Sequence, residues 1–134
     1  MYELNSERNL ITIFDAQTGK QVQFITNVIE TDEHINYRSE LIDVISKKKD
    51  AGEVYRFKLR WAEKIITGIQ GDYFTIEGKP ISSDKNVENY FAEWFAIIKR
   101  KRPDLLWKIV DHVFGENNII VKEEQIPFVN SSVS

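Results

Sequence analysis

Residues 54–83 read VYRFKLRWAEKIITGIQGDYFTIEGKPISS, and the rest of the chain can be placed around them. Apolar side chains recur in this stretch at spacings of three and four residues, which predicts one face of a helix: Val54, Phe57, Trp61 and Ile65. Cations recur at every fourth position on another face: Arg56, Arg60 and Lys64. The pattern therefore predicts an amphipathic helix with a basic outer stripe.

The sequence after this helix favours extended structure. Gly68 and Gly71 are expected to end the helix, because glycine is a common helix stop. Residues 73–76, YFTI, are aromatic or β-branched and predict a short extended segment, which the turn residues 77–80, EGKP, then reverse.

The sequence before this helix predicts a β-hairpin. Residues 9–14 (NLITIF) and 21–26 (QVQFIT) have strand-like alternation, and the polar link 15–20 with its glycine joins them. Because two strands are not stable alone in water, we expect the hairpin to pack on helices or to pair with a further strand.

Three more helices are expected. The polar residues 30–36 lead to a helix over 37–49, with its core side formed by Leu41, Ile42, Val44 and Ile45. Ser82, Ser83 or Asp84 is expected to cap the next helix, which reaches residue 102 and has the apolar residues Val87, Phe91, Trp94, Phe95 and Ile98. Pro103 suits the first turn of the last helix, whose apolar side comprises Leu105, Leu106, Ile109, Val110, Val113 and Phe114.

These elements predict an α+β fold, mainly α, with an N-terminal β-hairpin packed on about four helices. Residues 118–122 are a candidate for a last short strand. A chain of 134 residues fits a single domain over 1–134, with 129–134 expected to be a flexible tail. The chain has no cysteine and no signal-like apolar segment, which favours the cytoplasm, and no apolar run is long enough for a membrane helix.

The residue patterns do not suggest an active site. Neither His34 nor His112 has the spacing of a metal site, and no serine lies in a GxSxG or SxxK motif. We therefore expect a protein that is not an enzyme and has no metal or cofactor.

The charge is unevenly distributed along the chain. Residues 1–46 carry a net charge of −5, residues 47–102 carry +5 and residues 103–134 carry −3. Two basic clusters stand out, at 47–49 and at Lys99, Arg100, Lys101 and Arg102, and both complement predicted helix C-termini. Together with Arg56, Arg60 and Lys64, the second cluster is the candidate partner-binding site, and both clusters leave nucleic-acid binding open as an alternative.

Residues 54–83 and the helix after them resemble the tail assembly chaperones of long-tailed bacteriophages. The resemblance is carried by the segments 55–56 (YR), 61–62 (WA), 65–69 (IITGI), 71–72 (GD) and 78–81 (GKPI), followed by a helix of the 87–98 kind. That family has an aromatic residue where Ile69 stands, and an acidic run where residues 75–77 stand. The resemblance implies a small cytoplasmic protein, in the host if phage-encoded, which escorts the tape measure protein and self-associates along it.

The sequence thus predicts a non-enzymatic assembly factor that binds a protein client, with a long helical client implied by the resemblance, and that forms a homo-oligomer. Two alternatives stay open: a nucleic-acid-binding accessory protein that uses the basic clusters, and a phage or bacterial inhibitor that acts by surface contact.

Overall fold

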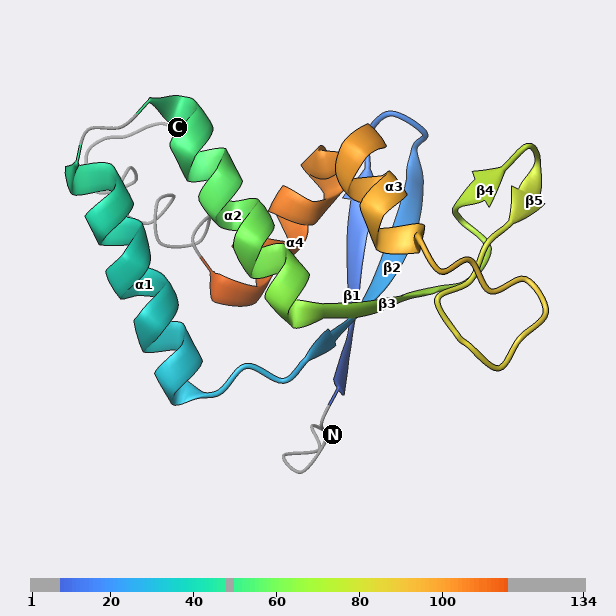
Figure 1. The fold of residues 1–134 in the computed structure, drawn as a ribbon, viewed down its shortest axis with the longest axis horizontal. Helices are drawn as coiled ribbons and strands as arrows, with labels where there is room; N and C mark the ends of the chain where they lie inside the picture. The colour runs from blue at the N-terminus through green and yellow to red at the C-terminus, as the bar shows by residue number, and fades with distance from the viewer. Residues whose placement is uncertain (1–7, 48–49, 116–134) are drawn as a thin grey trace.

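The computed structural model describes residues 8–47 and 50–115. It has an N-terminal hairpin and four helices, as predicted, and is an α+β structure in which helix predominates. Figure 1 shows the sheet beside the helices, with α1 and α2 adjacent at one end of the molecule. The elements in chain order are β1 (Arg8–Asp15), β2 (Lys20–Asn27), α1 (Thr31–Ser46), α2 (Ala51–Ile65), β3 (Ile66–Gln70), β4 (Thr75–Ile76), β5 (Lys79–Pro80), α3 (Trp94–Lys101) and α4 (Pro103–Phe114).

The sheet has three antiparallel strands in the order β1-β2-β3. Asp15 pairs with Lys20 at the closed end of the hairpin, and the pairing continues to Arg8 and Asn27. The predicted hairpin is confirmed, with each strand one residue longer at both ends. Side chains of β1 alternate between an exposed face and a face that turns toward the core.

The predicted helix in the central stretch is confirmed, but its end is not where the glycines suggested. Asp50 caps α2 by accepting a hydrogen bond from the Glu53 amide, and α2 ends at Ile65. The next five residues form β3, which pairs with β2. Gly68 lies inside this strand, paired with Ile25, and a Cβ at this position would lie only 2.9 Å from Ser83 Oγ. The prediction that Gly68 and Gly71 end the helix was therefore wrong.

The segment after β3 turns back as predicted. β4 pairs with β5, and the two residues between them, Glu77 and Gly78, both have positive φ angles of 52° and 80°. Such angles suit a tight two-residue hairpin turn.

Helix α1 begins earlier than the sequence predicted, and it buries fewer of its apolar side chains. A capping box between Glu30 and Glu33 starts it at Thr31, six residues before the predicted start at residue 37. Leu41 and Val44 are partly buried as expected, but Ile42 and Ile45 are exposed, so their assignment to the core was wrong.

The long helix predicted after Ser82 is also wrong, since only Trp94–Lys101 is helical. The expected capping side chains bond elsewhere: Ser82 Oγ accepts from the Asp84 amide, Asp84 Oδ1 accepts from the Asn86 amide, and Ser83 Oγ bonds to β3. Val87, which was assigned to the apolar face of that helix, is 41% exposed.

Helix α4 forms as predicted, from Pro103 to a left-handed Gly115 with φ of 72°. It buries five side chains in the core: Leu105, Leu106, Ile109, Val110 and Phe114. The Phe114 ring stacks on Tyr37 of α1 with 3.9 Å between centroids, and Trp61 of α2 meets both rings edge-on. The candidate strand 118–122 and the candidate tail 129–134 lie outside the described residues.

Candidate functional site

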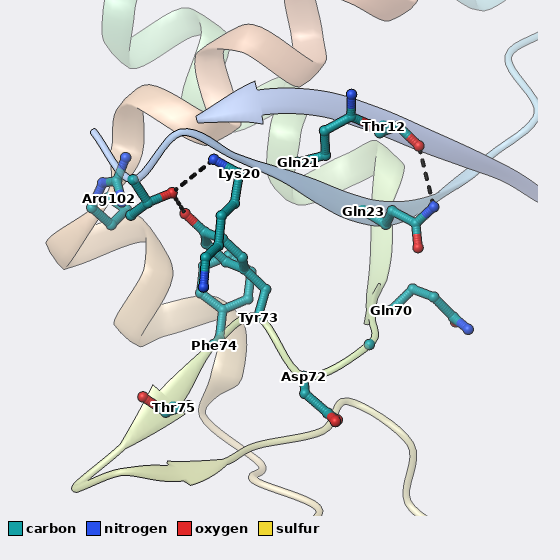
Figure 2. Close-up of a pocket in the computed structure, with 12 residues that line it drawn as sticks. Thr12, Lys20, Gln21, Gln23, Gln70, Asp72, Tyr73, Phe74, Thr75 and Arg102 are labelled. Atoms are coloured by element: carbon teal, nitrogen blue, oxygen red, sulfur yellow. Dashed lines mark hydrogen bonds between the residues drawn. The ribbon is translucent and has the colours of Figure 1, made fainter. Parts of the chain in front are cut away.

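A polar groove of about 670 Å³ lies where three distant parts of the chain meet. Figure 2 shows the hairpin strands above it, the loop after β3 below it and Arg102, from the junction of α3 and α4, at one end. The residues that line it are mostly amides, hydroxyls and charged groups: Thr12, Thr18, Lys20, Gln21, Gln23, Gln70, Gly71, Asp72, Tyr73, Phe74, Thr75 and Arg102.

A buried carboxylate holds this end of the groove together. Asp15 at the end of β1 is only 1% exposed. Its two oxygens accept hydrogen bonds from Arg102 Nη1 at 2.9 Å and from Arg102 Nη2 at 2.8 Å. The Tyr73 hydroxyl also donates to Asp15, and the Gln17 amide donates to it at 3.0 Å. Asp15 is thus a fully bonded buried anion with a bidentate arginine partner.

The pKa shifts in this network follow from these bonds. The hydrogen bonds from Arg102 and then from Tyr73 hold the pKa of Asp15 well below its usual range, against the opposing effect of burial. Burial and the hydrogen bond to Asp15 raise the pKa of Tyr73. Arg102 also lowers the pKa of Asp104, to which it donates at 3.0 and 3.1 Å.

The bidentate contact with Arg102 and the burial of Asp15 give the network a structural role. A general base works best with a pKa near the operating pH, whereas the pKa values of Asp15 and Tyr73 are moved away from neutrality in opposite directions. Asp15 and Arg102 therefore keep opposite charges and join β1 to the start of α4 across 87 residues of sequence. The remaining polar groups of the groove can bond a polar surface, and Gln23 already donates to Thr12 Oγ1 at 3.3 Å.

The predicted basic stripe lies on α2, but its members are not equivalent. Arg56 is bonded to Glu53 at 2.9 Å and lies 3.5 Å from Asp50. The Lys64 ammonium lies 4.3 Å from the centroid of the Trp61 ring, and the Trp61 indole donates to Glu40 of α1 at 3.1 Å. Arg60 is exposed. Lys64 thus lies close to the contact between α1 and α2.

The members of the basic cluster at 99–102 have different environments in the structure. Lys99 donates to Glu63 of α2 at 2.7 Å, and Arg102 belongs to the Asp15 network. Arg100 and Lys101 are exposed. In the other cluster, Lys47 is 3.1 Å from Asp43, and residues 48–49 lie outside the described part. The described members of the two clusters are therefore divided between ion pairs within the molecule and exposed side chains.

The surface that sequence reasoning missed lies on α1. Ile35, Ile42 and Ile45 are 58%, 66% and 58% exposed, and we call them the isoleucine stripe. Their spacings of seven and three residues place them along one side of the helix. Tyr37 is the one residue of α1 that is buried. The apolar periodicity of α1 was correctly recognised, but no sequence signal separated its core side from its exposed side.

The histidines do not form a site in the described residues. The His34 ring meets Phe114 edge-on at 5.3 Å, and His112 lines a second cavity of about 510 Å³ between β1 and α4. Across the part of the chain that the structure describes, no three histidine or carboxylate side chains gather as a metal site would need. Within residues 8–47 and 50–115, every helix is too short or too polar to cross a bilayer.

Comparison of the chain with protein-family models, with curated proteins and with solved structures gave no significant match.

Proposed function

We propose that this protein is a non-enzymatic assembly factor that binds another protein through α1. The observation that carries the proposal is the isoleucine stripe. Three large aliphatic side chains, each more than half exposed, follow one side of a 16-residue helix. A contiguous exposed apolar surface of this kind marks protein interaction sites, whereas single exposed apolar residues do not.

The partner that fits this surface is an amphipathic helix. A helix of the partner can lay its apolar face along α1, as in other helix-in-groove contacts. A long helical client agrees with the resemblance to tail assembly chaperones, in which self-association along the client is also implied.

The nucleic-acid alternative has less support. Lys99 and Arg102, half of the cluster at 99–102, are bonded to Glu63 and Asp15 inside the molecule. Arg100 and Lys101 are the members with exposed side chains. Micromolar binding of a single-stranded RNA or DNA oligonucleotide at physiological salt, abolished by Arg100→Glu with Lys101→Glu, would support that alternative instead.

A labelled peptide tests the proposal. The probe is a synthetic amphipathic helix with leucines along one face and polar residues on the other, measured by fluorescence anisotropy. The triple variant Ile35→Ser, Ile42→Ser, Ile45→Ser should weaken binding by at least about tenfold, because exposed apolar anchors dominate such contacts. The matched control is Leu10→Ser, which changes another aliphatic side chain that is 53% exposed, on β1, and should leave binding unchanged. A peptide that does not bind the unmodified protein, or that binds the triple variant equally well, contradicts the proposal.

A further inference from the structure

We propose that the outer edge of β1 binds an extended peptide segment of a partner protein, which adds to the sheet antiparallel to β1. The site is the groove between β1 and α4. This contact is additional to the one proposed for α1, because it uses a different surface and takes an extended segment rather than a helix. It follows from the direction of the β1 backbone groups, from the cavity beside them and from the charge of Lys108.

The contacts of β3 fix which backbone groups of β1 face outward. The amide and the carbonyl oxygen of Ile69 both bond to Ser83 Oγ, so they point away from β2. In an antiparallel ladder a residue exchanges both backbone bonds with the residue opposite it, or neither. Phe24 lies opposite Ile69 on one side and Ile11 on the other, so its backbone groups turn toward Ile11. The bonds from β1 to β2 therefore come from Ile11 and from alternate residues on each side of it.

Leu10, Thr12 and Phe14 consequently point their amides and carbonyl oxygens away from β2. Lys108 of α4 agrees with this direction, because it donates to the Phe14 carbonyl oxygen at 2.9 Å. Within residues 8–47 and 50–115, no strand pairs with this edge of β1, and no other bond reaches these backbone groups. The three amides and the carbonyl oxygens of Leu10 and Thr12 thus offer the bonds that an added strand makes.

A cavity of about 510 Å³ lies along this edge, where α4 packs beside β1 (Figure 1). Thr12, Ile13 and Phe14 line it from β1, and Lys108 lines it from α4. Side chains of an added strand alternate between the two faces of the sheet. Those opposite Leu10 and Phe14 would lie on the open face, beside two apolar side chains that are 53% and 54% exposed. Those in between would face the cavity, so the edge fits a segment with an apolar residue at every second position.

The charge of the cavity selects one of the residues that face it. Asp111 forms an ion pair with Lys58 at 2.9 Å, and this pair adds no net charge. His112 adds no negative charge either. The Lys108 side chain is exposed, and its ammonium bonds the Phe14 carbonyl oxygen, a neutral acceptor. A carboxylate on the added strand can bond this ammonium, and because the strand is antiparallel, the acidic residue belongs at the N-terminal end of the segment.

The size of the contact sets the expected affinity. A seven-residue strand spans roughly 23 Å and forms an interface smaller than the range of about 1,200 to 2,000 Å² that stable complexes bury. We therefore expect reversible binding with a dissociation constant on the order of tens of micromolar.

Fluorescence anisotropy with the full chain and a labelled peptide tests the site. The probe has the sequence Glu-Val-Thr-Val-Thr-Val-Thr, in which the valines lie opposite Phe14, Thr12 and Leu10. Methylation of the backbone nitrogen of the middle valine removes an N–H that faces β1 and should weaken binding at least about tenfold. The matched control is methylation of the next threonine, whose N–H faces away from β1, and it should leave binding within about twofold. Equal effects of the two methylations overturn the proposal, as does a probe that does not bind.

A charge exchange tests the role of Lys108. Lys108→Glu should weaken binding of the probe several-fold and strengthen binding of a second probe with lysine in place of glutamate. Lys101→Glu, which changes an exposed cation at the end of α3, should alter neither affinity. The melting temperature of each variant shows that the fold is kept. If Lys108→Glu leaves both affinities unchanged, the acidic residue does not meet α4 and the proposal fails.

Amide hydrogen exchange of the full chain shows whether the edge is open before the peptide binds. The amides of Leu10 and Thr12 should exchange quickly in the free protein and slowly with the probe bound, whereas the Ile11 amide, which bonds to β2, should be protected in both states. Slow exchange of Leu10 and Thr12 in the free protein means that another part of the chain already covers the edge, which overturns the proposal.

The outcomes separate this site from the proposed function. The triple variant of the isoleucine stripe should bind the strand probe as well as the unmodified protein does. If that variant melts normally and loses the strand probe, the probe binds α1 and the β1 site is excluded. If the helical peptide fails to bind while the strand probe passes these tests, the proposed function fails and the β1 site stands.

Discussion

Helices α1 and α4 are both amphipathic in sequence, but they use their apolar residues differently. Helix α4 has 12 residues and buries five of them, whereas α1 has 16 residues and buries one, Tyr37. The difference lies in their surroundings: α4 contacts β1, α2 and α3, while α1 lies at the outside of the fold. Amphipathic periodicity therefore predicts a helix, but it does not predict whether the apolar side faces its own core or a partner.

The largest expected effect comes from removing the one buried side chain of α1. Tyr37→Ala should lower the free energy of unfolding by about 4 kcal/mol, within the range for truncating a large buried aromatic. Chemical denaturation measures the loss. Hydrogen exchange should show α1 amides losing protection before those of α4, and equal loss in both helices would mean that α1 and α4 form one cooperative unit.

The start of α4 provides the next test. Arg102→Met should cost about 3 kcal/mol, because Asp15 would remain buried without its bidentate partner. Arg100→Met is the matched control, since that side chain is exposed two residues away and should change stability by less than about 0.5 kcal/mol. If the two changes lower the free energy of unfolding equally, the network does not have the structural role assigned to it.

The same network predicts how stability depends on acid. The folded-state pKa of Asp15 is below its unfolded value of about 3.9, so its contribution is present above that pH and is lost as the pH falls toward the folded value. Denaturation midpoints measured from pH 6 downward should therefore fall less steeply for Asp15→Asn than for the unmodified protein. Parallel pH profiles would contradict the assignment.

In its degree of burial, Trp94 at the start of α3 lies between the exposed isoleucines of α1 and the buried side chains of α4. The sequence counted it among the apolar residues of the helix that reaches residue 102, and the structure buries it only partly. Trp94→Ala should therefore cost about 1 to 3 kcal/mol, as measured by denaturation. Thermal melting that matches the unmodified protein would place Trp94 outside the core.

The smallest effect should come from the isoleucine stripe itself. Ile42→Ala should change the stability of the monomer by less than about 0.5 kcal/mol, because the side chain is 66% exposed. Leu106→Ala in α4, where the side chain is fully buried, should cost about 2 to 5 kcal/mol. Both are measured by denaturation at a concentration where the protein is monomeric, and a large cost for Ile42→Ala would mean that the stripe is part of the core.

Much of the fold could be predicted because its signals are local. The hairpin alternation, the spacing of Phe57, Trp61 and Ile65, and Pro103 at the start of α4 all depend on neighbours a few residues away. β3 was missed because two glycines outweighed the β-branched residues before and between them. Within β3, Gly68 leaves room for the Ser83 side chain, and this close approach is not visible in a sequence pattern.

The candidate sites were harder to predict, because they depend on contacts far apart in sequence. In the sequence, Arg102 cannot be distinguished from its basic neighbours. Only the structure shows that it donates hydrogen bonds to Asp15. Ile42 and Ile45 have the same spacing as core residues, and only the position of α1 in the fold shows that they face outward. Arg60, Arg100 and Lys101 are exposed cations in the structure.

The contact between Ser83 and β3 has a consequence for how this sheet can grow. Ser83 Oγ accepts a hydrogen bond from the Ile69 amide at 2.9 Å and donates to the Ile69 carbonyl oxygen at 3.3 Å, so it occupies the outer side of β3 at this residue. An incoming strand would have to displace it there, whereas β1 ends the sheet on the other side. Fibrils built by adding strands need two free edges on every molecule. Ser83 therefore hinders the addition of a strand to β3 at Ile69.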